Sequence, residues 1–238
     1  GIWLAKNEGY AKELRVIGLS TVYLQFDGVI EEPYLVARNK NLLSVKLEAI
    51  EKCREAGLGI VLVPTLVKGI NDDQVGDILR FAMKNIDIIH GVNFQPVSFS
   101  GRTPHEEVEK QRITIPDFIN LVDEQTNHDI IPDDFYPPSF VQPISRFAGA
   151  LQGSEPPVYL NCHEHCGVGT YAFLQGDEVI PVTRFIDVEK LMDLLNKYTD
   201  ELEEGGFGKQ KRVIAKAIKN VPNVVDSDKT PDILNMKK

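Results

Sequence analysis

Two cysteines and two histidines fall within one short stretch of the chain, YLNCHEHCGVGTY at residues 159–171. Thiolates and imidazoles are the side chains that zinc, iron and iron–sulfur clusters prefer as ligands. Cys162, Cys166 and the two histidines nevertheless lie within five residues, and four ligands so close in sequence cannot close a tetrahedron around one ion. The stretch therefore supplies at most part of a metal site. A surface loop that is rich in these residues by chance is the alternative.

Polar side chains also occur at the ends of three apolar, β-branched runs. These runs are TVYLQFD at 21–27, GIVLVPTL at 59–66 and GVNFQPV at 91–97. The polar residues are Gln25 and Asp27 in the first run, Thr65 in the second, and Asn93 and Gln95 in the third. Because α/β proteins bind ligands at the carboxyl ends of parallel strands, the set predicts a site for a polar cofactor with hydroxyl groups and an amino-acid part. Each residue taken alone is explained equally well as a partner for loop backbone.

Helical patterns separate these runs, which is the arrangement that would bring their ends together. The helical stretches are 7–18, 41–58 with Gly57 as C-cap, and 71–85 with Asn71 or Asp72 as N-cap. The runs begin 38 and then 32 residues apart, the length of a strand–helix unit. The alternation predicts an α/β fold with a parallel sheet, in barrel or doubly wound form.

The pattern changes after residue 98. A polar loop at 100–112 precedes a helix at 114–127 that begins with Thr114 as N-cap. The segment 129–145 contains four prolines, which predict an irregular, wrapped segment. The remaining expected elements are a β-hairpin that turns at Gly176-Asp177, an amphipathic helix at 187–206 capped by Asp187, and a basic helix at 209–221.

Composition narrows the class of protein. The 238 residues carry a formal net charge of −9 and three cysteines. The acidic balance argues against nucleic acid as a partner, and the low cysteine count favours a reducing, cytoplasmic location over a disulfide framework. No run of about 18 apolar residues is present. The abrupt ends, GIWL and LNMKK, lead us to expect a piece of a longer polypeptide, with a processed start on a complete domain as the alternative.

The order of these blocks resembles the radical S-adenosylmethionine (SAM) superfamily. VYLQFDG, PTLVKGINDDQVGDI, NFQPVSFSGR and the later HCGVGTY are most similar to the archaeal tetraether lipid synthases, part of a broader group once described as pterin-methylating. The resemblance implies that the chain is the carboxyl-terminal half of a partial (β/α)6 barrel with an appended α+β module carrying a metal site. The implied divisions are the end of strand three to strand six at 1–100, a wrapping segment at 101–155, an auxiliary-site module at 156–221 and a flexible tail at 222–238.

The resemblance also implies cofactors and their residues. SAM would be held by Gln25, Asp27, Arg38, Thr65, Asn93 and Gln95, with Arg38 a candidate for its carboxylate. Cys162 and Cys166 would donate one arm of an auxiliary iron or iron–sulfur centre, with Cys166 the better supported ligand. The CxxxCxxC motif that holds the family's [4Fe–4S] cluster is not in this sequence, and Cys53 stands alone in an outer helix. The chain as given would therefore not hold that cluster and would be inactive by itself.

The implied activity is a radical reaction that joins isoprenoid lipid chains by a C–C bond, with an electron donor such as ferredoxin or flavodoxin. Methylation of a pterin or another small molecule is one alternative, and a non-catalytic nucleotide-binding half-barrel is another. Phe94, Phe99, Phe135, Tyr136 and Phe140 favour a lipid substrate but are equally typical of core packing. The basic helix at 209–221 predicts a solvated face, with peripheral membrane contact as the less favoured role.

Overall fold

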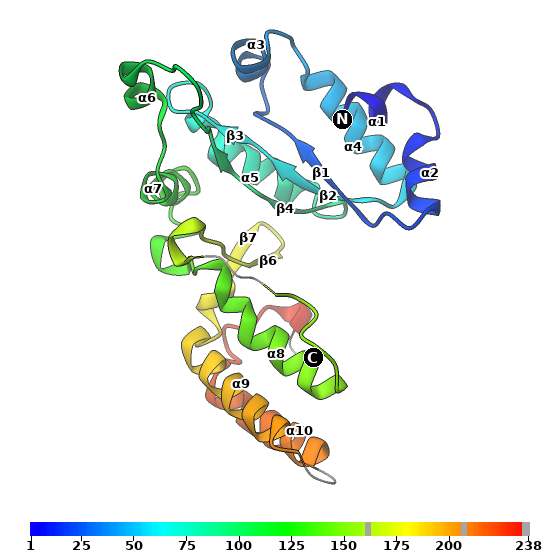
Figure 1. Ribbon diagram of the computed structural model, residues 1–238, viewed down its shortest axis with the longest axis vertical. Coiled ribbons are helices and arrows are strands. Elements are labelled where there is room, and N and C mark those ends of the chain that lie inside the picture. Colours follow the sequence, from blue (N-terminus) through cyan, green and yellow to red (C-terminus); the bar gives the residue numbers. More distant parts are fainter. Residues whose placement is uncertain (160–162, 206–208, 235–238) are drawn as a thin grey trace. The chain divides into compact units, whose positions relative to one another are not determined.

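The computed structural model describes residues 1–159, 163–205 and 209–234. The chain divides into two compact units, Gly1–His128 and Asp129–Lys238, which we call the first and the second unit (Figure 1). The division at 128 differs from the predicted boundaries at 100, 155 and 221, which remain predictions.

The first unit alternates helices and strands along the chain. Its helices are α1 (Ile2–Lys6), α2 (Tyr10–Val16), α3 (Glu32–Arg38), α4 (Leu43–Ala56), α5 (Val75–Lys84), α6 (His105–Gln111) and α7 (Ile115–Gln125). Its strands are β1 (Thr21–Gln25), β2 (Gly59–Val63), β3 (Thr65–Leu66), β4 (Ile89–Val92) and β5 (Gln95–Pro96). The three apolar runs therefore supply the strands, as the sequence predicts.

All strand pairs of the first unit are parallel. β1, β2 and β4 form a sheet in the order β1-β2-β4, and β3 pairs with β5. The second pair prolongs the first sheet, since the Asn93 amide donates to the Leu62 carbonyl at 2.7 Å and the Gln95 amide donates to the Pro64 carbonyl at 2.9 Å. The expected α/β class is confirmed. The barrel is not, because the strands described here form an open sheet.

Two predictions for the ends of elements are wrong. The resemblance places the end of strand three at Gly1-Ile2, but α1 begins at Ile2, and its Leu4 and Ala5 are buried in the core. Asn71 does not cap a helix with its side chain, since a 3₁₀ turn at Asp72–Gln74 precedes α5. Gly57 does end α4 in the left-handed conformation, with φ of 67°.

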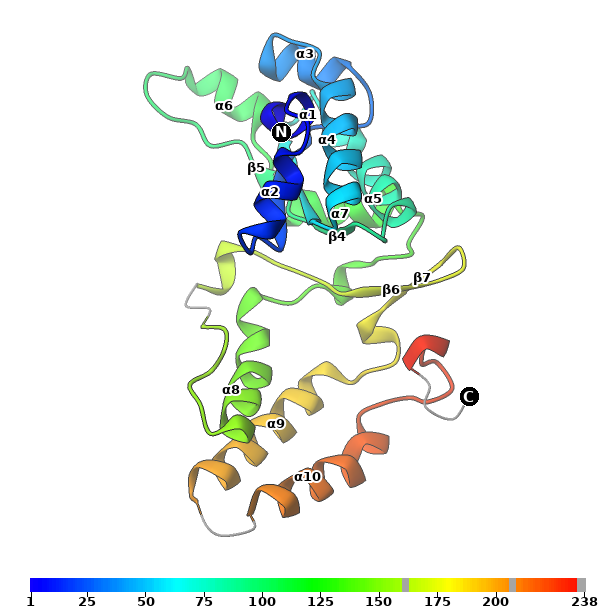
Figure 2. The same cartoon turned by 90° about the vertical axis from the view of Figure 1, so that its right-hand side faces the viewer.

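Helices cover one face of the sheet. The core contains Leu24 of β1, Ile60 and Leu62 of β2, Ile50 of α4 and Ile78 of α5. Helix α4 lies against β2 with α1 and α2 beside it, and α5 lies against β4 with α7 packed on it (Figures 1 and 2). Side chains alternate across a strand, so the residues between these core positions point to the opposite face.

The second unit has the α+β composition that the sequence predicts. Its elements are the helices α8 (Gln142–Gln152), α9 (Val188–Glu203) and α10 (Lys209–Asn220) and the antiparallel hairpin of β6 (Ala172–Gln175) and β7 (Glu178–Pro181). Asp187 caps α9 by accepting the Lys190 amide, and Gly176 turns the hairpin with φ of 64°. Helix α6 lies within the polar loop predicted at 100–112, and α8 begins within the segment 129–145 that was predicted to be irregular. Pro143 stands in the first turn of α8, where proline begins a helix rather than breaking it.

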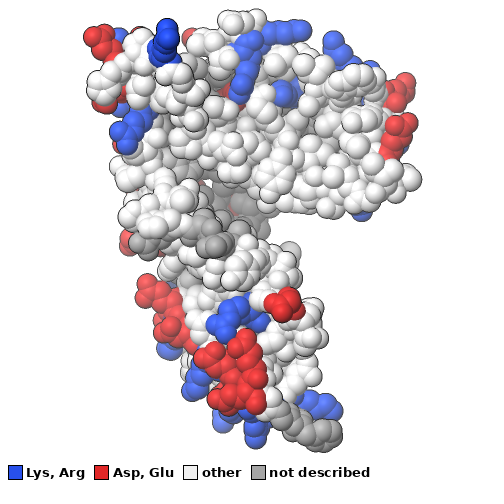
Figure 3. Space-filling model, in the orientation of Figure 1, with Lys and Arg blue, Asp and Glu red and all other residues white. Residues whose placement is uncertain are grey.

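Acidic and basic side chains stand next to one another over the helices of the second unit (Figure 3). Lys216 pairs with Glu201 at 2.6 Å, and Arg146 lies 3.2 Å from Glu203. Lys209, at the start of α10, pairs with Glu204. Part of the basic helix is therefore neutralised by α9, as expected of a solvated face. No helix in the described ranges is both long and apolar enough to cross a bilayer.

Candidate functional site

The strand ends of the first unit carry polar groups on the face of the sheet opposite the core helices. Gln25 is the register partner of Val63, and Thr65 is the register partner of Gln95. Asn93 is two residues before Gln95 and therefore faces the same way. Gln25 and Thr65 are half-buried, whereas Asn93 and Gln95 are exposed. The structure thus brings four of the predicted residues to one edge and one face of the sheet.

Asp27 is the centre of this edge. It lies directly beyond β1 and is fully buried. One carboxylate oxygen, Oδ1, accepts the Thr65 amide at 3.1 Å and Arg38 Nη2 at 3.4 Å. The other, Oδ2, accepts Arg38 Nε at 2.9 Å and the Gln25 side-chain amide. A buried carboxylate needs such donors, because leaving a charge without partners in the interior is costly.

Arg38 comes from the last turn of α3, an element that the sequence did not predict. Besides its ion pair with Asp27, its Nη2 donates to Thr65 Oγ1 at 3.1 Å. Its side chain is 35% exposed, so one side of the guanidinium still reaches solvent. Gln25, Asp27, Arg38 and Thr65, four of the six predicted SAM residues, therefore form one hydrogen-bonded group, which we call the Asp27 cluster.

Asn71 lies next to the Asp27 cluster and bridges backbone groups instead of capping a helix. It is 1% exposed, and its side-chain amide donates to the carbonyl oxygens of Asp27 and Thr65, both at 2.9 Å. Its Oδ1 accepts the Val67 amide at 2.8 Å. One side chain thereby joins the ends of two neighbouring strands. The sequence offered one indication of this role, the asparagine of VKGIND. A short side-chain amide can cap a helix or, when buried, hydrogen-bond to backbone groups of two segments.

Tyr34 and Lys46 are buried titratable residues that the sequence did not single out. The Tyr34 hydroxyl donates to the Gly28 carbonyl at 2.9 Å, and burial raises the pKa of this phenol. Lys46, in the first turns of α4, is only 5% exposed. Burial lowers the pKa of the Lys46 ammonium, the charge of Asp27 opposes that shift, and the charge of Arg38 adds to it.

The Cys/His loop belongs to the second unit and is only partly described. Cys162 lies outside the described residues. Cys166 is exposed and ends a 3₁₀ turn that begins at Glu164. His163 Nδ1 accepts the His165 amide at 3.2 Å, and the two rings meet edge to face with centroids 4.9 Å apart. Among the described residues no group of three or more His, Cys, Asp or Glu could hold a metal ion, so the metal site remains a prediction.

Comparisons with known proteins find that the chain is similar in sequence to a pterin methyltransferase and to GTP cyclases. It is 48% identical over 237 residues to a 7,8-dihydro-6-hydroxymethylpterin dimethyltransferase of Methanocaldococcus jannaschii, covering 98% of this chain and 46% of that relative. It is 32% identical over 108 residues to a GTP 3′,8-cyclase of Listeria monocytogenes, covering 44% of this chain and 31% of the cyclase. A GTP 3′,8-cyclase of Helicobacter pylori is 32% identical over 84 residues, with 35% and 26% covered.

These relatives support the prediction that the chain belongs to the radical SAM superfamily. They do not support the finer likeness to tetraether lipid synthases that the sequence motifs suggested. No family model matches the chain. The chain spans less than half the length of each of these relatives.

Proposed function

We propose that the chain is part of a radical SAM enzyme that methylates a pterin. The observation that carries this proposal is the 48% identity to the pterin dimethyltransferase, which extends over 98% of the chain and therefore includes both units. This was the alternative interpretation of the sequence. The main interpretation of the sequence, an enzyme that joins isoprenoid chains, is not supported by these relatives.

The Asp27 cluster suits the nucleoside of SAM. The side-chain amide of Gln25 and the hydroxyl of Thr65, both half-buried at the carboxyl ends of neighbouring parallel strands, can exchange hydrogen bonds with ribose hydroxyls. When bound to the full-length enzyme and reduced by its electron donor, SAM would supply a 5′-deoxyadenosyl radical for hydrogen-atom abstraction. In this proposal the half-buried Gln25 and Thr65 contact the ribose and the buried Asp27 holds both of them in place, while the exposed Asn93 and Gln95 contact SAM or the pterin.

The [4Fe–4S] cluster does not fit the residues of this sequence. The three cysteines of the chain are Cys53, Cys162 and Cys166, and they do not form a CxxxCxxC motif. Cys53 is fully buried in the core of the first unit, where burial raises the pKa of its thiol. We assign no step of the reaction to residues of this chain acting through that cluster. An electron donor such as ferredoxin or flavodoxin is part of the proposal.

The aromatic residues give a lipid substrate no independent support. Phe94 packs on Phe118 of α7, with centroids 5.0 Å apart. In the second unit, Phe140 packs between Tyr136 at 5.7 Å and Tyr171 at 6.0 Å. Such contacts are typical of aromatic side chains that stabilise their own unit.

Product analysis of the full-length protein tests the proposal. The protein would be reconstituted with iron and sulfide without oxygen, reduced, and incubated with SAM and 7,8-dihydro-6-hydroxymethylpterin. We expect mass spectrometry to detect 5′-deoxyadenosine and methionine from the cleaved SAM. We also expect a pterin that has gained one or two methyl groups, each taken from a further SAM that leaves as S-adenosylhomocysteine, with two electrons from the reductant for each methyl group. An isoprenoid lipid in place of the pterin is the parallel reaction, and joined lipid chains without methylated pterin would overturn the proposal. SAM that is bound but not consumed would support the non-catalytic alternative.

A further inference from the structure

A row of side chains crosses the open face of the sheet beside the Asp27 cluster. The strand register places Tyr23 of β1 next to Val61 of β2, and Val61 next to Gly91 of β4. Leu24 and Leu62, which follow two of these residues, are buried in the core, so the row itself points to the opposite face. The row therefore shares its face with the Asp27 cluster and lies one pleat, about 7 Å, nearer the amino ends of the strands.

This row is flat and open, with an aromatic ring at one side. Gly91 has no side chain, and nothing lies within 4 Å of a Cβ built on it. Val61 is half-buried, whereas Tyr23 on the edge strand is 68% exposed. The three residues span two strand spacings, about 10 Å. We call them the Gly91 platform, and a flat apolar surface beside an exposed aromatic ring suits a planar ring system.

Two polar side chains border the Gly91 platform. The His90 ring lies on the same face, because a Cβ built on Gly59 would be 2.7 Å from its Cε1 and Nδ1 atoms. Asn93 follows Gly91 by two residues and is exposed. Within the described ranges neither side chain has a hydrogen-bond partner. An imidazole and an amide can each donate to or accept from the polar edge of a ring on the platform.

We propose that the Gly91 platform binds the pterin ring, which stacks on Tyr23 while His90 and Asn93 hydrogen-bond to its polar edge. The inference rests on the proposed function, which makes a pterin the substrate and places the ribose of SAM at Gln25 and Thr65. A substrate that reacts with a 5′-deoxyadenosyl radical must lie in contact with that ribose. The platform meets this condition, because Tyr23 precedes Gln25 by two residues on the same face of β1.

Binding measurements with two ligands test this assignment. Equilibrium dialysis of the full-length protein without oxygen gives the affinities for 7,8-dihydro-6-hydroxymethylpterin and for SAM, in the wild type, Tyr23→Leu and Gly91→Val. Tyr23→Leu removes the stacking ring, and we expect it to weaken pterin binding roughly 5- to 50-fold. Gly91→Val fills the platform and should weaken pterin binding by a similar factor, roughly 5- to 100-fold. The SAM affinity should change less than about threefold in both variants, because other residues bind SAM.

Matched variants control for effects on the fold. Tyr23→Phe keeps the ring and should keep the pterin affinity within about threefold. Trp3→Leu removes a ring that is 69% exposed on α1, among the helices that cover the other face, and it should change neither affinity. If Tyr23→Leu does not fold, the glycine decides: Gly91→Val must lose pterin affinity, and Gly91→Ala must lose less of it.

The outcomes separate this inference from the proposed function. Wild-type pterin affinity in either Tyr23→Leu or Gly91→Val would overturn the assignment. Equal losses for pterin and SAM would also overturn it, because the platform would then hold the adenine of SAM or support the fold. Failure of the wild type to bind the pterin would sink the proposed function as well, whereas pterin binding that does not depend on the platform would sink this inference alone.

Discussion

At the scale of single residues, Asp27 holds the strand ends together through side-chain and backbone donors. Asp27→Asn keeps the size of the side chain but replaces an acceptor by a donor that faces Arg38 and the Thr65 amide. We expect the free energy of unfolding to fall by about 1–3 kcal/mol. This is less than for a fully buried ion pair, because the Arg38 side chain is partly exposed and water can solvate its charge. Urea unfolding followed by circular dichroism measures the change.

Asp77→Asn is a matched control for that prediction. Asp77 also pairs with an arginine, Arg80 at 2.8 Å, but both side chains are exposed. Exposed pairs contribute about 1 kcal/mol or less. Equal destabilisation by the two substitutions would show that the Asp27 cluster is no more than a surface ion pair.

The sequence could predict part of this site. Gln25, Asp27 and Thr65 were found because parallel strands place their carboxyl ends at one edge. The partner of Arg38 and the burial of Lys46 depend on how α3 and α4 pack, which no local pattern encodes. Which of the grouped residues touch SAM stays a prediction.

At the scale of elements, α7 begins with a capping box that the sequence predicts in part. Thr114 Oγ1 accepts the Asp117 amide at 3.3 Å, and Asp117 accepts the Thr114 amide at 2.9 Å. Thr114→Ala should lower the free energy of unfolding of the first unit by about 1 kcal/mol, as N-cap replacements do. Thermal unfolding at pH 7 measures this loss.

The loss should depend on pH. The hydrogen bonds from the Thr114 hydroxyl and amide lower the pKa of the Asp117 carboxyl. A lowered pKa in the folded state adds stability above the unfolded pKa and removes it as pH falls through the folded pKa. The difference between wild type and Thr114→Ala should therefore shrink below about pH 3.8. A difference that grows on acidification would contradict this account.

Close packing of α5 on α7 depends on Gly76. A Cβ on Gly76 would lie 2.5 Å from the Gln125 carbonyl oxygen, which belongs to the backbone and cannot swing away. Gly76→Ala should therefore destabilise the first unit by about 1–3 kcal/mol, although alanine is the better helix former. Gly91→Ala makes the same change in β4, where nothing lies within 4 Å of the new Cβ. We expect Gly91→Ala to be neutral or slightly stabilising in denaturant melts, and a similar loss in both variants would refute the packing argument.

Elements with strong periodicity were predictable, and those set by tertiary contacts were not. The β-branched runs became strands, and Thr114 and Asp187 began their helices. The segment from Ile2 forms a helix because Leu4 and Ala5 bury against α4. Nothing in so short a segment distinguishes it from a strand end.

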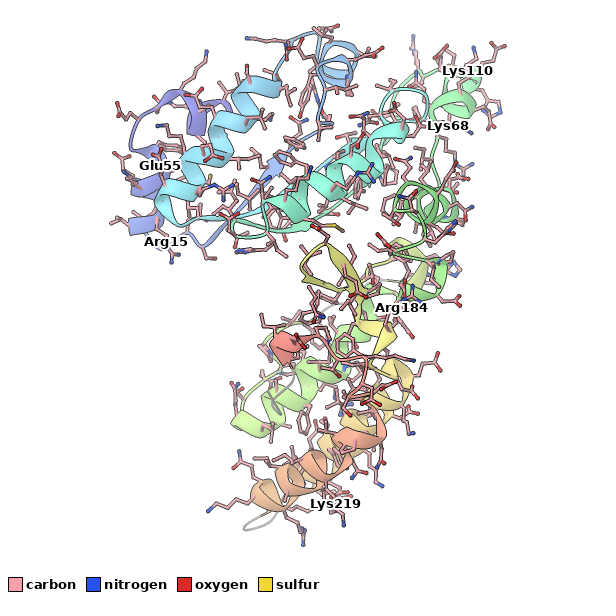
Figure 4. All side chains as sticks on the ribbon, turned by 180° about the vertical axis from the view of Figure 1, so that it is seen from behind. Arg15, Glu55, Lys68, Lys110, Arg184 and Lys219 are labelled. Carbon is pink, nitrogen blue, oxygen red and sulfur yellow. The ribbon has the colours of Figure 1, made fainter. Side chains whose placement is uncertain are left out.

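At the scale of the whole chain, each unit has a core of its own. The first is built from α1, α2, α4, α5 and the parallel sheet. In the second, Ile180, Phe185, Val188, Tyr198 and Val213 are buried. Asp134, 1% exposed, accepts the Ile131 amide and pairs with Arg184 at 3.0 Å (Arg184 is labelled in Figure 4). This carboxylate ties two distant segments of the second unit together.

Separate cores predict separate responses to substitution. Asp134→Ala leaves the Ile131 amide and Arg184 without their acceptor, so the second unit should lose about 2–4 kcal/mol. Gly76→Ala should act on the first unit alone. Amide hydrogen exchange at low denaturant, measured for both variants, reports the stability of each unit separately through the protection of the helices in that unit. Protection should fall in α8 and α9 for Asp134→Ala and in α4 and α5 for Gly76→Ala, because contiguous segments open as cooperative units. Loss of protection in all four helices in either variant would mean that the chain unfolds as one body, and the stability of the Asp27 cluster would then depend on the second unit as well.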